Sequence, residues 1–134
     1  MKNKFEIIGL FRGIDSNTNE FRYGFYFSDV IEGKHYIHLK RDEVFEVKQN
    51  PIDFYSNKCA VNGQPIYSGD IIQGFNSDVK WEVEYDVNES CFMVVSQTLH
   101  CVSQQTLSHF IKHHKNQVFI FGNIYSLKST PNEK

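Results

Sequence analysis

Short stretches of alternating apolar and polar residues constrain the fold of this 134-residue chain more than any other feature. In the clearest stretch, residues 79–87, Val, Trp and Tyr alternate with Lys, Glu and Asp. A period of two places successive side chains on opposite faces of a β-strand, one face buried and the other in solvent. We therefore predict a mostly β fold built from half-buried antiparallel strands.

The first third of the chain predicts an aromatic-rich hairpin over residues 21–39. Its turn is expected at residues 32–34, where Glu, Gly and Lys interrupt the alternation. Alternation in the first strand of this hairpin places four aromatic side chains on one face: Phe21, Tyr23, Phe25 and Phe27. The sequence leaves open whether this hairpin is all core or partly an exposed binding patch.

Other strand boundaries follow from turn-forming residues. Turn formers at 13–17 are expected to end a first strand over 5–11, and Pro51 to end a short strand over 44–47. Gly122 marks a bulge or a close backbone approach within the last strand. Further strands are predicted at 71–73, 91–95 and 118–124.

Two tight turns are predicted in the middle of the chain. Asn62-Gly63 is a preferred pair for a type I′ turn, in which both central residues take positive φ. Ser68-Gly69-Asp70 predicts a second turn. Gly69 supplies a backbone conformation that other residues adopt only at a cost, and Asp70 can accept from nearby backbone N–H groups. We interpret these residues as structural rather than catalytic.

One short helix is predicted around residues 107–114. Ser103 is placed to cap its N-terminus, and Asn116 to take the left-handed C′ position. Apolar and aromatic side chains recur at helical spacing in Leu107, Phe110, Ile111 and His114.

Composition narrows the class of protein. Hydrophobic residues make up 40% and charged residues 22%, which is ordinary for a globular domain, and the formal net charge is −2. No apolar run reaches the roughly eighteen residues of a membrane-spanning helix, and we expect no signal peptide and no membrane association. Three cysteines without a CxxC pair favour reduced thiols and a cytoplasmic location.

The charged residues define an acidic segment and a basic segment of the sequence. Residues 59–98 hold one Lys against six Asp and Glu, whereas residues 99–134 hold four Lys and four His against one Glu. Such complementary segments can meet within the fold or between copies, so a homo-oligomer is possible. The candidate partner-binding residues are Glu82, Glu84 and Asp86, and the candidate basic patch is Lys112, His113 and Lys115.

The sequence gives little support for an enzyme active site or for a metal site. Adjacent His100 and Cys101 do not by themselves form a nucleophile–base pair, and no phosphate-binding loop or nucleophile-elbow motif occurs. We predict a protein that is not an enzyme and uses no cofactor. A metal site can be drawn from residues whose spacings match no known zinc module: Cys91, His100, Cys101, His109, His113 and His114.

Nucleic-acid binding is the main alternative, because small β-barrels often bind single strands through exposed aromatic side chains. The chain has three Arg residues and an acidic middle segment, so a basic contact would rest on the Lys112 to Lys115 segment.

Two segments resemble the YopX family of phage and prophage proteins. The first reads N-G-Q-P-I-Y-S-G-D-I over residues 62–71, and the second reads G-N-I-Y over residues 122–125. The N-terminal order of F-R-G, Y-G and G-K-H-Y-I also follows the family, while residues 57–60 depart from its pattern. The signature residues are Asn62, Gly63, Tyr67, Gly69, Asp70, Gly122, Asn123 and Tyr125.

The resemblance implies a fold and an origin, but no chemical activity. It implies a small SH3-like barrel in the C-terminal part, residues 59–127, packed with an N-terminal β subdomain, residues 1–58, and followed by a polar tail, residues 128–134. It also implies a phage or prophage protein acting inside a bacterial cell. With no catalytic motif, we expect a non-catalytic module that binds a host or phage protein and modulates a host factor.

Overall fold

The computed structural model describes residues 10–40, 43–75, 77–97 and 101–125. It confirms a mostly β fold with one short helix. The chain divides into two compact units, with the change from one to the other after Tyr55; the predicted boundary lies between residues 58 and 59. The predicted tail, and residues 5–9 of the predicted first strand, lie outside the described residues.

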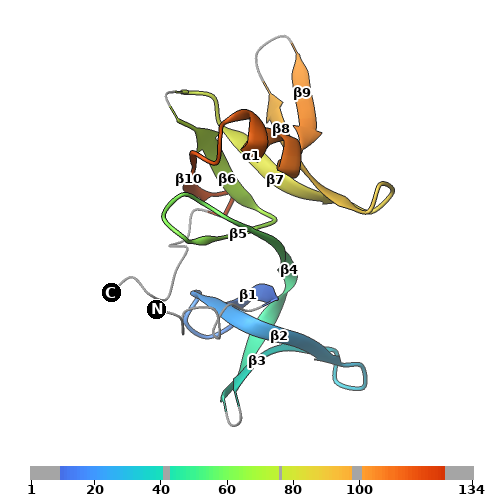
Figure 1. Ribbon diagram of the computed structural model, residues 1–134. Coiled ribbons are helices and arrows are strands. Elements are labelled where there is room, and N and C mark those ends of the chain that lie inside the picture. The colour runs from blue at the N-terminus through green and yellow to red at the C-terminus, as the bar shows by residue number, and fades with distance from the viewer. Residues whose placement is uncertain (1–9, 41–42, 76, 98–100, 126–134) are drawn as a thin grey trace. The chain divides into compact units, whose positions relative to one another are not determined.

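Four antiparallel strands build the N-terminal unit (Figure 1). Each strand pairs with the next one along the chain, and the fourth also pairs with the first, so the strands close into a ring. The predicted hairpin over residues 21–39 is confirmed, and Gly33 in its turn has a φ of 71°. The strands are β1 (Phe11–Asp15), β2 (Phe21–Asp29), β3 (Lys34–Lys40) and β4 (Glu43–Cys59).

Two predicted boundaries in this unit are wrong. Gly13 lies inside β1 rather than in a turn, and a Cβ at that position would lie 3.2 Å from the side chain of Val47. The glycine therefore permits two strands to approach closely. Pro51 does not end a strand, because β4 continues through it. The register of β4 against β1 shifts at this point, between the residues of β4 that pair with Asp15 and with Gly13. Strands tolerate proline where the ladder is interrupted.

The C-terminal unit is an antiparallel sheet with a helix on one face (Figure 1). The strands lie in the order β10-β6-β7-β8-β9. Its core joins Val83 and Val94 of the sheet to Leu107 and Phe110 of the helix. The short strand β5 is not part of this sheet and pairs with β4. The elements are β5 (Pro65–Tyr67), β6 (Asp70–Gly74), β7 (Trp81–Asp86), β8 (Cys91–Gln97), β9 (Val102–Thr106), α1 (Leu107–His113) and β10 (Val118–Asn123).

Both predicted turns in the middle of the chain are present, but one has a different type. Gly63 has a φ of 90°, whereas Asn62 is not left-handed, so this is not a type I′ turn. The N–H of Gly63 donates to the carbonyl of Ala60 at 2.9 Å, and the N–H of Ala60 donates to the carbonyl of Gln64 at 2.8 Å. A three-residue loop with a left-handed glycine at its end is the next most common hairpin connection.

The helix forms where predicted, but its N-cap was predicted wrongly. Ser103 lies in β9, because residues 102–106 pair with β8. The cap is Thr106, whose hydroxyl accepts from the N–H of His109 at 3.1 Å. At the C-terminal end of the helix Asn116 is left-handed, as predicted. Lys115 is also left-handed, and Lys115 rather than Asn116 takes the C′ position. The N–H of Asn116 returns to the carbonyl of Ile111 at 2.9 Å and closes the helix.

The strands at 71–73, 91–95 and 118–124 are confirmed with small shifts at their ends. The ring of strands is found in the N-terminal unit, and an SH3-like barrel in the C-terminal part stays a prediction. Among the described residues, no helix is long and apolar enough to cross a membrane.

Candidate functional site

The three predicted acidic residues line one face of β7. Glu82, Glu84 and Asp86 alternate with Val83, which is fully buried in the core beneath α1. The acidic side chains therefore lie on the sheet face opposite α1. Glu84 is exposed and the other two are half-buried. Asp86 also has a local role, because its carboxylate accepts from the N–H groups of Asn88 and Glu89 at 2.9 and 3.2 Å.

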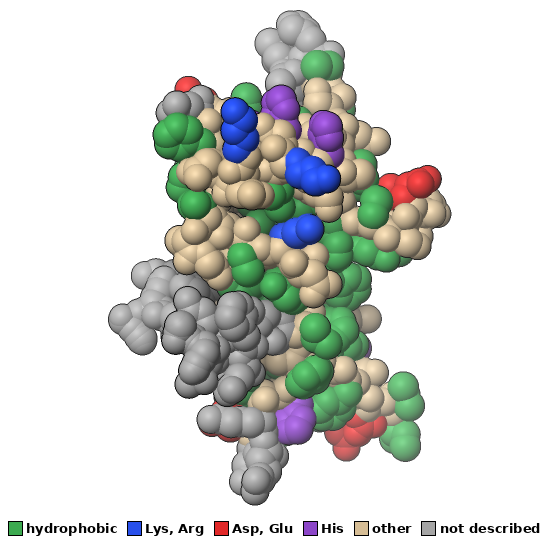
Figure 2. All heavy atoms as spheres, in the orientation of Figure 1, with side chains coloured by type: hydrophobic (Ala, Val, Ile, Leu, Met, Phe, Trp, Pro, Cys, Tyr) green, Lys and Arg blue, Asp and Glu red, His purple; other side chains and the backbone are tan. Residues whose placement is uncertain are grey.

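The predicted basic residues lie at the end of α1, and all three are exposed: Lys112, His113 and Lys115. Figure 2 shows Lys and His side chains gathered on the face that carries α1. Cations at a helix C-terminus interact favourably with the helix dipole. Within the C-terminal unit, the acidic and basic patches thus lie on opposite faces of one sheet and do not neutralise each other.

The two halves of the signature motif are brought together in the structure. Asn123 of β10 lies directly opposite Asp70 of β6, and the N–H of Ile124 donates to the carbonyl of Gly69 at 2.9 Å. Asp70, only 1% exposed, accepts from the N–H of Tyr67 at 2.8 Å, as predicted. These contacts give the motif a structural role: it joins the β5–β6 turn to the last strand.

The last strand also contains the predicted bulge. The register of β10 against β6 shifts between Ile120 and Gly122, so that Phe121 is the extra residue. A bulge turns its extra side chain away from the regular ladder. Phe121 is accordingly exposed, and the ammonium of Lys80 lies 4.3 Å from the centre of its ring.

The candidate metal ligands do not converge among the residues that the structure describes. No group of three or more His, Cys, Asp or Glu within that part of the chain could hold a metal ion. His109 and His113 stack on α1 with ring centres 6.2 Å apart, whereas Cys91 lies on β8. His100 lies outside the described residues, and with it the His100–Cys101 pair.

His114 packs against the backbone of β6. Its ring lies over Gly74, where a Cβ would fall within 2.2 Å of Nδ1, and its centre is 4.4 Å from that of Phe110. Burial lowers the pKa of His114, and the neighbouring His113 lowers it further. The sequence placed His114 on the helix but gave no indication of its contact with Gly74, which depends on tertiary structure.

Asp15 organises the turn between β1 and β2. Its carboxylate accepts from the N–H groups of Asn17 and Thr18 at 2.7 and 3.1 Å, and from Arg22 Nε at 2.8 Å. Burial raises the pKa of this carboxyl, but the hydrogen bonds from Arg22, Asn17 and Thr18 and the charge of Arg22 outweigh it. The net pKa of Asp15 lies below its ordinary value.

An exposed apolar surface lies on one face of the predicted hairpin, and it decides between the two alternatives that the sequence left open. Phe25 is 56% and Phe27 is 45% exposed, so the aromatic-rich hairpin is partly an exposed patch rather than all core. Among the described residues, β1 pairs with the first half of β2, up to Gly24, whereas the second half of β2 pairs with β3. Cross-strand pairing places on the same face a set that we call the aromatic face: Phe25, Phe27, Tyr36, His38 and Val44.

The turn of this hairpin continues the apolar surface. Val30 and Ile31 are 87% and 91% exposed. The carboxylate of Asp29 accepts from the N–H groups of Ile31 and Glu32 at 3.0 and 3.2 Å, which fixes the turn. Two aliphatic side chains are thus presented to solvent by an ordered backbone.

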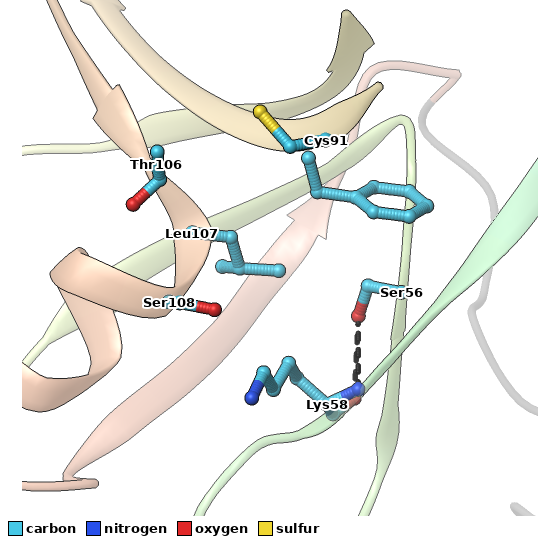
Figure 3. Close-up of a pocket in the computed structure, with 7 residues that line it drawn as sticks. Ser56, Lys58, Cys91, Thr106, Leu107 and Ser108 are labelled. Atoms are coloured by element: carbon cyan, nitrogen blue, oxygen red, sulfur yellow. Dashed lines mark hydrogen bonds between the residues drawn. The ribbon is translucent and has the colours of Figure 1, made fainter. Parts of the chain in front are cut away.

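The C-terminal unit contains a pocket of about 320 Å³ beside the start of α1 (Figure 3). Its residues come from β4, β8 and the junction of β9 with α1, three segments that are distant in sequence. No sequence signal marked Lys58 as part of a site. The lining residues are Ser56, Lys58, Cys91, Phe92, Thr106, Leu107 and Ser108.

Neither a scan against protein-family models nor a search of curated proteins finds a match to this chain.

Proposed function

We propose that this chain is a non-catalytic protein-binding module that engages a host or phage protein through the aromatic face. The observation that carries the proposal is the exposure of Phe25 and Phe27, which occupy alternate positions of β2 and therefore share one face. Phe27 stacks on Tyr36 with ring centres 5.1 Å apart, so the face offers ordered rings rather than scattered side chains. Contiguous exposed apolar surface marks interaction sites, and aromatic residues dominate the energetics of protein interfaces.

The charge around the aromatic face favours a protein partner over a nucleic acid. Asp29 lies directly opposite Lys34, and Glu46 lies directly opposite Tyr36, so both signs of charge border the rings. Single-stranded nucleic acid is bound by stacking combined with a positively charged groove. A mixed rim around an apolar centre is the pattern of protein interfaces.

We also propose a phage or prophage origin and action in the bacterial cytoplasm, as a YopX-like protein. The support is the sequence pattern of residues 62–71 and 122–125, together with the contact of these two segments between β6 and β10. A motif whose halves form one structural element is more specific than two unrelated short matches. Modulation of a host factor is the role that this origin suggests.

The test is affinity capture from a nuclease-treated bacterial lysate with the tagged full chain. The wild type is compared with a Phe25→Ser/Phe27→Ser variant and with a matched control, Phe75→Ser/Phe121→Ser, which removes two exposed aromatic side chains of the C-terminal unit. We expect the first variant to weaken binding of a stoichiometric partner by about thirtyfold or more. The control is expected to retain the partner.

Two further results bear on the same proposal. Equal capture by wild type and the Phe25→Ser/Phe27→Ser variant, with both folded by circular dichroism, overturns the assignment to the aromatic face. Changing Glu82, Glu84 and Asp86 to Lys then tests the acidic residues as the partner surface. Retained nucleic acid without a protein partner favours the nucleic-acid alternative, and light scattering of the purified chain distinguishes self-association.

A further inference from the structure

The pocket beside α1 combines an apolar floor with two polar groups at its edge. Leu107 is buried in the core and Phe92 is half-buried, so both present hydrocarbon to the pocket. Figure 3 shows Lys58 reaching from β4 toward Leu107 and Ser108 of α1. Binding sites for small molecules typically have mostly apolar walls and a few convergent polar groups, and begin at about 300 Å³.

The hydrogen bonds of the lining residues determine which polar groups can receive a ligand. The hydroxyl of Ser56 accepts from the N–H of Lys58 at 3.1 Å, and that of Thr106 accepts from the N–H of His109 at 3.1 Å. Among the described residues, the ammonium of Lys58 and the hydroxyl of Ser108 have no such partner. A cation and a hydroxyl at one edge of an apolar pocket can both donate to one anionic group.

The electrostatic environment also favours an anion. The first turn of α1, which borders the pocket, has no acidic residue. Three acidic residues pair with the pocket strand β8, namely Glu82, Glu84 and Asp86, and all three lie on the sheet face opposite α1. The carboxylate of Asp86, opposite Cys91, already accepts two backbone N–H groups. The charge that the lining residues themselves bring to the pocket is that of Lys58, which is positive.

We propose that this pocket binds a carboxylate that carries a short apolar group. Lys58 and Ser108 donate to the carboxylate, while Leu107 and Phe92 contact the hydrocarbon. One lysine without an arginine suits a singly charged carboxylate better than a phosphate, which is commonly held by bidentate arginine or several donors. The carboxylate belongs either to a free small acid or to the C-terminal residue of a peptide. The proposal is independent of the proposed function, because no residue of the aromatic face lines the pocket.

The experiment is a nuclear magnetic resonance titration of the isotope-labelled full chain with N-acetyl-L-leucine and, separately, with N-acetyl-L-leucinamide. The two probes differ only in the negative charge of the terminal group. We expect saturable shifts centred on the backbone N–H groups of Ser56, Lys58, Leu107 and Ser108, and affinity for the amide lower by about tenfold.

Variants separate the pocket from the general positive charge of the surface. Lys58→Met keeps the aliphatic part of the side chain and is expected to weaken N-acetyl-L-leucine binding by about tenfold. Lys112→Met removes an exposed lysine of α1 that does not line the pocket and is expected to change the affinity less than about twofold. Lys58 is exposed, so its replacement does not threaten folding.

A pentapeptide ending in leucine, with a free or an amidated C-terminus, distinguishes the two sources of the carboxylate. Tighter binding of the free-acid peptide than of N-acetyl-L-leucine supports a peptide C-terminus, and equal affinity supports a small acid. The proposal is overturned if acid and amide bind equally, if Lys58→Met binds as well as wild type, or if no probe produces shifts around the pocket. Failure here leaves capture through the aromatic face unaffected.

Discussion

Arg12 and Asp53 form a buried ion pair across the seam that closes the N-terminal ring. They lie directly opposite each other on β1 and β4, and Arg12 Nε is 2.9 Å from the carboxylate of Asp53. The guanidinium also lies over the ring of Phe21, 4.2 Å from its centre. Arg12 is only 1% exposed and Asp53 4%, so the four-stranded ring includes a charged pair in its core. Such a pair fixes which strands meet, because a mispaired strand would leave a buried charge uncompensated.

Removing one partner of this pair is expected to destabilise the protein strongly. Asp53→Asn removes the carboxylate that lies 2.9 Å from the buried Arg12 Nε, and we expect the free energy of unfolding to fall by about 3–5 kcal/mol. Urea unfolding followed by circular dichroism measures the change. Asp78→Asn, at an exposed position, is the control and is expected to change stability by less than about 0.5 kcal/mol. Equal stabilities of the two variants would contradict a structural role for the pair.

The signature turn makes a second prediction. Asp70→Ala removes the buried carboxylate that accepts from the N–H of Tyr67 at 2.8 Å. We expect a loss of about 1–3 kcal/mol in the free energy of unfolding. Because Asp70 pairs with Asn123, hydrogen exchange should also accelerate at the end of β10. Unchanged exchange at Asn123 would show that the turn and the last strand are not coupled.

The contact between Gly74 and His114 makes a third prediction. Gly74→Ala places a methyl group within 2.2 Å of the imidazole, so the helix end must shift, at an expected cost of about 1–3 kcal/mol. Gly122→Ala is the matched control, because a Cβ there meets nothing within 4 Å. Combining Gly74→Ala with His114→Ser is expected to restore part of the loss. A Gly74→Ala variant as stable as the Gly122→Ala variant would exclude the close contact.

The lowered pKa of His114 predicts how the free energy of unfolding depends on pH. Its pKa is lower in the folded protein than the ordinary value of 6.5, because of burial and the neighbouring His113. The unfolded chain therefore binds this proton at a higher pH than the folded protein does. The stability that neutral His114 contributes to the folded protein is therefore complete above about pH 6.5, and it is lost as the pH falls toward the pKa of His114 in the folded protein.

Urea unfolding at several pH values between about 5 and 7.5 measures this effect. The His114→Gln variant is expected to lose less stability on acidification than wild type, because it lacks the group whose pKa is lowered by folding. A steeper loss in the variant would reverse the sign of the predicted linkage.

Local sequence rules predicted the elements whose formation depends on neighbouring residues. The hairpin over residues 21–39, the turn at Gly69 and the bulge before Gly122 all follow from residue types that permit one backbone conformation more readily than others. The same rules placed α1, because Leu107 and Phe110 share one helix face. For the candidate patches, alternation correctly put Glu82, Glu84 and Asp86 on one face of β7.

The errors in strand boundaries and in the helix cap arose where pairing with another strand determined the outcome. Pro51 lies within β4 because the pairing with β1 shifts there, and Ser103 lies in β9 because it pairs with Ser96 of β8. The residue types next to Pro51 and Ser103 do not show this pairing.

The sequence by itself thus determined the β class, the main turns and the position of the helix, since these depend on backbone preferences over a few residues. Only the tertiary structure decided that Arg12 is core while Phe25 is exposed, and that Lys58 meets the start of α1. Burial depends on which strands cover a side chain, and in this protein those strands come from distant parts of the chain. The proposed aromatic face and carboxylate pocket both rest on this long-range arrangement.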